Sequence, residues 1–261
     1  MLSSEMRACG ILHQDQPKRK LRTAIENTPS GQLLIANNTP LSSVTRGQRL
    51  TFTPVEDYYT GRQDATSGIM FGNMSTNDIE IPVAIKPHDN IASALSEFCI
   101  TQHLISEGHI KPYQPLGFLS GRDSIYTLSA FEGDVVSCDT ITDGTDIPKK
   151  IQKVLLVGAA TLAMLHKSGV AHGDAQIKNT AFSVKTGEER AIDLTSSYFD
   201  KSGRGIIDDM HSYIDTLPDY ISPVLNNKYI EKYFIDPYLS LVAGALSKKQ
   251  QDSVHRVTNN L

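Results

Sequence analysis

The chain has 261 residues, of which 39% are hydrophobic and 21% charged, a balance typical of globular proteins and unlike that of disordered or fibrous ones. Its formal net charge of −4 argues against a general nucleic-acid binder, and its longest apolar stretches are too short and interrupted to span a bilayer, so we expect neither direct nucleic-acid binding nor a membrane partner. Three cysteines without metal-ligand spacing, and a start that lacks an apolar leader, predict a cytoplasmic protein.

Residues 1–47 are polar and contain a basic cluster, Lys18-Arg19-Lys20 with Arg22. Charge runs of this kind are usually solvated, so a surface arm without a partner is favoured over a docking or nucleic-acid role. At most one short strand is expected there, at Gln32–Ala36. We therefore interpret residues 1–47 as a polar, basic extension.

Residues 48–133 are predicted to be rich in strands, because short segments alternate apolar and polar side chains between turn-forming residues. One helix is expected among them, capped by Asn90 and ended by Gly108. The expected strands are 49–55, 67–74, 79–86, 116–119 and 124–131.

Residues 134–261 are predicted to be mainly helical. The strongest helical pattern runs over 151–167, with Gly169 as its C-terminal stop. The remaining expected elements are strands at 179–184 and 190–194 joined by a turn at 185–188, a helix at 206–217, and a helical stretch from about 226 to 249, broken near Pro237. This order predicts an α+β chain with a β-rich N-terminal lobe and an α-rich C-terminal lobe.

The most informative stretch follows the 151–167 helix. It contains His172-Gly173-Asp174, then Asn179, then Asp193. Two carboxylates and an amide so placed suit phosphoryl transfer: Asp174 would orient a hydroxyl and accept its proton, while Asn179 and Asp193 would hold Mg²⁺. Taken singly, Asp174 and Asn179 are also explained by turn chemistry, since Asp and Asn are common in turns.

Two neighbours of these residues have ordinary explanations as well. Lys178 could contact the transferred phosphate, although an exposed loop lysine accounts for it nearly as well. A lone histidine is more often structural than catalytic, so His172 is interpreted as packing and hydrogen-bonding to hold the loop.

A further lysine ends the expected strand with the sequence Val83-Ala84-Ile85-Lys86. An ammonium group there can pair with phosphate oxygens, but it needs a partner to hold it in place. Glu97, next to the core positions of the following helix, can be that partner, with Glu107 in reserve. By itself this signal is weak, because a strand that ends in a solvated lysine is common.

In this order and spacing, the residues resemble the protein-kinase-like superfamily over about residues 50–215. The resemblance implies a two-lobed fold with ATP and Mg²⁺ as cofactors, and lobes at 48–133 and 134–261. It implies these roles: Asp174 and Lys178 catalytic; Lys86 and Glu97 nucleotide-binding; Asn179 and Asp193 metal ligands; Ala130, Phe131 and Glu132 an adenine-binding hinge; Gly61 and Gly68 the bounds of a phosphate loop; and Asp209 a brace for the catalytic loop.

The chain also departs from the pattern of that family. Glycine stands at 173, where the family usually has arginine; aminoglycoside phosphotransferases also have glycine there. Asp193-Leu194-Thr195 replaces Asp-Phe-Gly. The sequence has no glycine-rich Gly-x-Gly-x-x-Gly motif and no Ala-Pro-Glu segment. These departures argue against regulation by activation-loop phosphorylation and against an ordinary eukaryotic-type protein substrate.

The expected function is that of a small atypical or bacterial serine/threonine-protein kinase that transfers phosphate from ATP to a protein. The acceptor and the oligomeric state stay open. A second hypothesis is autophosphorylation within the N-terminal segment, which contains Ser3, Ser4, Thr23, Thr28, Ser30, Ser42, Ser43 and Thr45. The alternatives are a small-molecule or sugar phosphotransferase of the aminoglycoside-phosphotransferase type and a nucleotide-binding pseudokinase that acts as a partner module.

Overall fold

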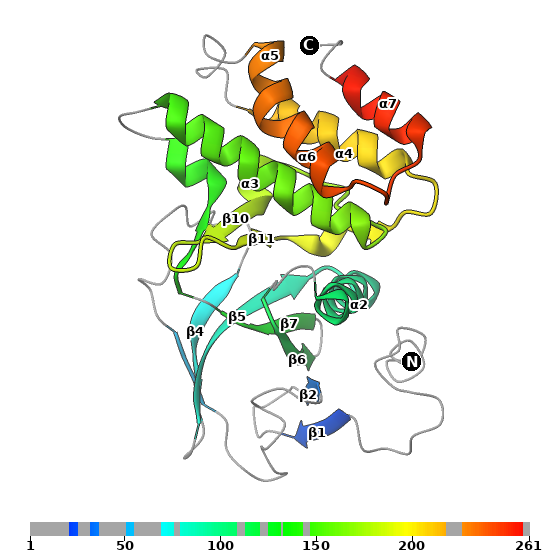
Figure 1. Cartoon of the computed structure of the whole chain (residues 1–261). Helices are drawn as coiled ribbons and strands as arrows, with labels where there is room; N and C mark the ends of the chain where they lie inside the picture. Colours follow the sequence, from blue (N-terminus) through cyan, green and yellow to red (C-terminus); the bar gives the residue numbers. More distant parts are fainter. Residues whose placement is uncertain are drawn as a thin grey trace. The chain divides into compact units, whose positions relative to one another are not determined.

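The structure is a computed structural model that combines helices with antiparallel sheets, which places the chain in the α+β class (Figure 1). It divides into two compact units, Met1–Gln102 with Tyr113–Gly133, and His103–Pro112 with Asp134–Leu261. The residues described are 21–25, 32–36, 51–54, 69–75, 79–108, 113–120, 125–131, 133–142, 147–217 and 226–257.

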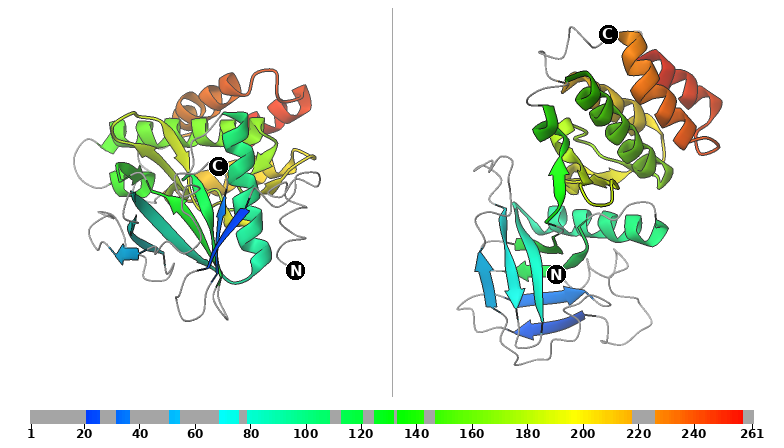
Figure 2. Two further views of the ribbon diagram at one scale, coloured as in Figure 1. Left: turned by 90° about the horizontal axis from the view of Figure 1, so that it is seen from below. Right: turned by 60° about the vertical axis from the view of Figure 1, so that its left-hand side comes forward.

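The described strands of the first unit form one antiparallel sheet in the order β1-β2-β6-β7-β5-β4-β3, seen from two further directions in Figure 2. The strands are β1 (Leu21–Ile25), β2 (Gln32–Ala36), β3 (Thr51–Pro54), β4 (Met70–Ser75), β5 (Glu80–His88), β6 (Pro115–Ser120) and β7 (Ile125–Ala130).

The first two strands fall within residues 1–47, where at most one strand was expected. That expectation was wrong for β1, because Leu21–Ile25 does not alternate apolar and polar side chains and includes Arg22 of the basic cluster. Both strands belong to the same sheet as β3 to β7. At least these parts of residues 1–47 are therefore built into the first unit.

Strand β5 separates two environments, because successive side chains point to opposite faces of a sheet. Ile81, Val83 and Ile85 lie in a core cluster with Met74, Leu116 and Leu128. Lys86 and His88 alternate with them and point to the other face. Helix α2 (Ile91–Glu107) packs there through Phe98, whose ring lies 4.6 Å from that of Phe118.

Helices form most of the second unit: α3 (Ile147–Lys167), α4 (Arg204–Asp215), α5 (Asn227–Ile230), a π turn (Glu231–Ile235), α6 (Asp236–Leu241) and α7 (Lys248–Val257). The longest, α3, is buried along one side through Val154, Leu155, Leu162 and Leu165. Tyr213 of α4 donates to the carbonyl of Val154 over 2.9 Å and stacks on Phe234. No helix in the described part of the chain is both long and apolar enough for a bilayer crossing.

Short strands and 3₁₀ turns of the second unit carry the polar loops. The strands are β8 (Val135–Ser137), β9 (Val170–Ala171), β10 (Thr180–Ser183), β11 (Glu189–Ala191) and β12 (Tyr198–Phe199). The 3₁₀ turns are Cys138–Thr142, Ile177–Asn179 and Leu194–Ser196. β10 and β11 form the predicted hairpin, whereas β8, β9 and β12 are too short to produce a periodic sequence signal.

The expected helix break near Pro237 is wrong. Helical backbone continues from Asn227 to Leu241, and the break comes only before Lys248. The π turn explains this, because the N–H of Asp236 bonds to the carbonyl of Glu231, five residues back. Pro237 then stands in the first turn of α6, where its missing N–H costs little.

Candidate functional site

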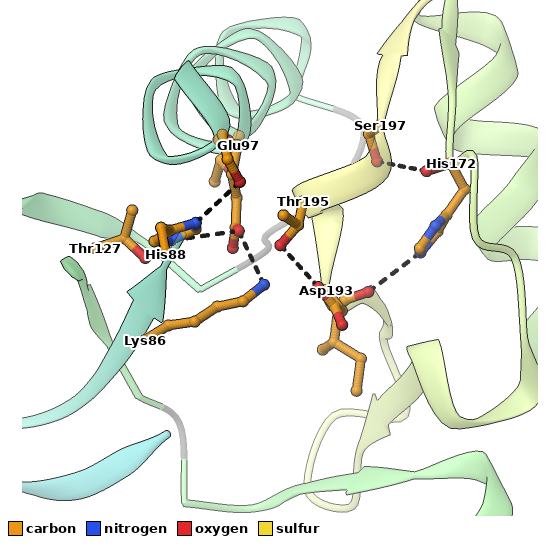
Figure 3. A network of polar contacts seen from close by, with 11 residues as sticks. Lys86, His88, Glu97, Thr127, His172, Asp193, Thr195 and Ser197 are labelled. Carbon is orange, nitrogen blue, oxygen red and sulfur yellow. Dashed lines mark hydrogen bonds and ion pairs between the residues drawn. The ribbon is translucent and has the colours of Figure 1, made fainter. Parts of the chain in front are cut away.

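The ion pair that the sequence predicts between Lys86 and Glu97 is present in the first unit (Figure 3). Lys86 Nζ lies 2.9 Å from Glu97 Oε2, and the two side chains are 18% and 17% exposed. Asn90 fixes where α2 begins, because its Oδ1 accepts from the backbone N–H of Ser93 over 2.9 Å. The reserve candidate, Glu107, is exposed at the far end of α2.

His88 joins this pair, although sequence analysis missed it. Its Nε2 lies 3.0 Å from Thr127 Oγ1 and 3.7 Å from Glu97 Oε2, and its Nδ1 lies 3.3 Å from Ser93 Oγ. The side chain is only 1% exposed. Strand alternation could have revealed it, since residues two apart share one face of a sheet.

The predicted hinge positions are engaged within the first unit itself. The N–H of Ala130 donates to the carbonyl of Gln114 over 2.8 Å, and that of Phe131 to Pro82 over 2.9 Å. The Phe131 ring is buried and lies 4.8 Å from the ring of Phe71. These two N–H groups are thus used within the sheet, whereas the adenine-binding role of the hinge stays a prediction. The other predicted positions, Gly61, Gly68 and Glu132, lie outside the described residues.

In the second unit, the buried carboxylate of Asp209 braces the loop that begins at His172. It accepts from the backbone N–H of His172 over 2.6 Å and from that of Gly173 over 2.8 Å. Oxygens placed on two successive N–H groups fix the local backbone. Asp209 thus makes the bracing contacts that the resemblance implies.

His166 and Tyr238 complete this network. His166 Nε2 lies 3.0 Å from Asp209 Oδ2, and its Nδ1 lies 2.8 Å from the Tyr238 hydroxyl. Burial, and then the charge of Asp209, raise the pKa of Tyr238 far above its usual range, so its hydroxyl stays a donor. Because a carboxylate only accepts, His166 Nε2 donates to Asp209, and the Tyr238 hydroxyl can donate to Nδ1.

Asp174 and Asn179 are linked side chain to side chain. Asn179 Nδ2 donates to the backbone carbonyl of Asp174 over 2.8 Å and to its Oδ2 over 3.0 Å, while Gln176 Nε2 donates to Oδ1 over 2.5 Å. The amide nitrogen of Asn179 is thereby used in contacts to Asp174, and these contacts do not involve its Oδ1. Lys178 lies in the same turn with its side chain exposed.

Asp193 is placed beside this loop by the β10–β11 hairpin. The N–H of Ile192 donates to the carbonyl of Asn179 over 3.0 Å, and His172 Nε2 lies 3.1 Å from the carbonyl of Ile192. The exposed carboxylate of Asp193 accepts from Thr195 Oγ1 over 2.9 Å (Figure 3). His172 therefore ties the two segments together, the structural part expected of it.

The backbone of Asp193 is strained. With φ at 56°, it is the one non-glycine residue of positive φ in the described chain. Aspartate tolerates this left-handed conformation better than most residues, yet it still costs about 1 kcal/mol or more. This turn also explains why the strand expected at 190–194 ends earlier, with β11. Strain of this kind is common where a side chain is held for function.

The donor set of Asn179 and Asp193 fits Mg²⁺. One amide oxygen and one carboxylate are hard oxygen ligands, and Mg²⁺ commonly takes only one or two protein ligands while water and phosphates complete its shell. Within the described ranges, no three His, Cys, Asp or Glu side chains cluster in a way that could hold a metal ion.

Gly173 is required by space and by backbone conformation. Its φ is 76°, and an added Cβ would collide with the carbonyl oxygen of Ser196. We expect Gly173→Ala to lower the free energy of unfolding by about 3 kcal/mol, measured by urea denaturation. Gly187→Ala is the matched control, since Gly187 has a φ of 72° but open space, and should cost about 1 kcal/mol. Equal losses in both variants would show that Ser196 moves aside without cost.

A comparison with models of known protein families gives no match to this chain, and a comparison with curated proteins gives none either. Its function is therefore inferred from the residues and contacts above.

Proposed function

We propose that the chain is an ATP- and Mg²⁺-dependent phosphotransferase with a two-lobed, protein-kinase-like fold, acting in the cytoplasm. A small atypical serine/threonine-protein kinase is the leading form of this proposal. One observation supports it: Asp174, Asn179 and Asp193 belong to two segments of the second unit that hydrogen bonds join, from Asn179 Nδ2 to Asp174 and from the N–H of Ile192 to the carbonyl of Asn179. Turn chemistry within the loop of Asp174 and Asn179 gives no reason for a second carboxylate, Asp193, to follow directly after the segment that is bonded to this loop.

In this proposal Asp174 orients the attacking hydroxyl and takes up its proton as the new oxygen–phosphorus bond forms. The bond between the γ-phosphorus and the departing ADP oxygen breaks in the same step. Asn179, by holding Oδ2 of Asp174, and Gln176, by holding Oδ1, restrict the carboxylate to one orientation. Positioning of this sort supplies much of the catalysis in phosphoryl transfer.

In this proposal, other groups stabilise the negative charge of the phosphate oxygens. Bound Mg²⁺ would neutralise negative charge on the phosphate oxygens. Asn179 and Asp193 would hold that ion, and Lys86 would contact phosphate oxygens while Glu97 keeps its ammonium group in place. A lysine restrained in this way loses less side-chain entropy on binding than a free one.

The test is phosphate transfer from labelled ATP by the pure protein with Mg²⁺, alone and with a cell lysate, for wild type and Asp174→Ala. We expect labelled protein with the wild type and loss of nearly all label with the variant. Lys185→Ala, which changes an exposed charge of the hairpin turn, should behave as wild type. Equal labelling by the wild type and Asp174→Ala would contradict the proposal.

Two arms of this assay separate the alternatives. A panel of aminoglycosides and sugars in place of lysate tests the small-molecule phosphotransferase, which the glycine at 173 favours. Mass spectrometry of the wild type tests autophosphorylation, and that hypothesis fails if residues 1–50 gain no phosphate. Nucleotide binding without any transfer would indicate a pseudokinase.

A further inference from the structure

His88 and Lys86 approach the same atom, Oε2 of Glu97. Lys86 Nζ lies 2.9 Å from it and His88 Nε2 lies 3.7 Å from it. Figure 3 shows the histidine ring between Thr127 and Glu97, on the side of the carboxylate away from the lysine. The same oxygen of Glu97 is therefore approached by the ammonium group of Lys86 and by an imidazole, that of His88, which can gain a proton.

The surroundings of His88 allow two charge states with different contacts. A neutral ring can donate from Nε2 to Thr127 and accept at Nδ1 from Ser93. A protonated ring becomes a second buried cation beside Glu97. Glu97, on α2, is a charged group that lies against the ring, and Lys86, on the same strand as His88, contacts the same Glu97 oxygen. The partners from β7 and from the first turn of α2, Thr127 and Ser93, are uncharged hydroxyls.

Two cations at one oxygen oppose each other. Protonation of His88 would attract Glu97 Oε2 toward the ring and would repel the ammonium group of Lys86. Histidine is the side chain whose charge ordinarily changes between about pH 5 and pH 8. The Lys86–Glu97 pair should accordingly be intact when His88 is neutral and weakened when it is protonated.

We propose that His88 is a positioning residue for the Lys86–Glu97 pair. The position of the Lys86 ammonium group, and with it the contact of Lys86 with phosphate, would then depend on pH. This inference rests on the proposed function only in that Lys86 contacts the phosphates of ATP. The contacts among His88, Glu97 and Lys86 stand without it.

The activity test is the pH profile of kcat/KM for ATP with the full chain. Between about pH 8 and pH 5.5 we expect the wild type to lose about tenfold more than His88→Gln, because this is the range in which histidine ordinarily changes its charge. Glutamine keeps an N–H donor but does not titrate, so at pH 8 this variant should stay within about threefold of wild type. The titration of ATP itself is common to all proteins compared.

The matched control is His103→Gln. His103 is bonded to the carbonyl of Ser168 and lies edge-on to Phe199, and it should leave the pH profile unchanged. Parallel profiles for wild type and His88→Gln would overturn the proposal.

A second readout does not need activity. The ring nitrogens of His88, followed by NMR in the full chain and assigned by their loss in His88→Gln, report its protonation directly. Glu97→Gln removes an opposite charge and should lower the titration midpoint, whereas Lys86→Met removes a like charge and should raise it. If the wild type transfers no phosphate but both shifts occur, the proposed function fails and the coupling of His88 to the pair stands. If neither midpoint moves, the inference about His88 fails even in an active kinase.

Discussion

Asp193→Asn is expected to lower kcat for phosphate transfer by about a thousandfold, equivalent to about 4 kcal/mol of barrier. Asparagine keeps the size of the side chain, the acceptor for Thr195 and the tolerance for a positive φ, but it removes the negative charge. Stability should therefore change little while the metal contribution is lost. The measurement is the transfer rate as a function of Mg²⁺ concentration, together with a thermal melt.

The control for Asp193→Asn is Asp215→Asn, which removes an exposed charge at the end of α4 and should transfer phosphate at the wild-type rate. Asp193→Ala should be as inactive as Asp193→Asn and somewhat less stable, because alanine is less tolerant of the left-handed backbone. Normal turnover in Asp193→Asn with an unchanged Mg²⁺ requirement would remove Asp193 from the metal site.

The Lys86–Glu97 pair could be predicted because two local periodicities point its members the same way. Strand alternation turns Lys86 away from the Ile81, Val83 and Ile85 face, and the helical period places Glu97 beside the buried Phe98. The hairpin that carries Asn179 toward Asp193 was predictable for a similar reason, since Gly187 supplies the positive φ that its turn needs. These features depend on residues close in sequence.

Features that depend on distant strand or helix partners could not be predicted. The N–H groups of Ala130 and Phe131 are occupied because Gln114 and Pro82 happen to be their neighbours, which only the sheet order decides. His166 is bonded to Tyr238 of another helix, and no local sequence pattern predicts this contact. His88 was missed for a different reason: its strand was expected to end at Lys86, whereas β5 continues to His88.

The buried carboxylate of Asp209 gives the largest expected loss of stability. It accepts from the backbone of His172 and Gly173 and from the ring of His166, and it is 2% exposed. Asp209→Ala leaves these donors buried without an acceptor, so we expect the free energy of unfolding to fall by about 3–5 kcal/mol. Because domains are stable by only about 5–15 kcal/mol, urea denaturation should show a large shift of the midpoint.

The neighbouring Asp208→Ala is the matched control for Asp209→Ala. Asp208 makes only an exposed ion pair with Arg204 at 3.7 Å, so its loss should cost less than about 0.5 kcal/mol. Tyr238→Phe, which removes the hydroxyl bonded to His166, should cost about 1 kcal/mol. A loss below about 1 kcal/mol for Asp209→Ala would mean that water replaces the carboxylate. The graded series matters because Gly173 adds flexibility to the unfolded loop, so the native loop geometry must be held by contacts such as those of Asp209.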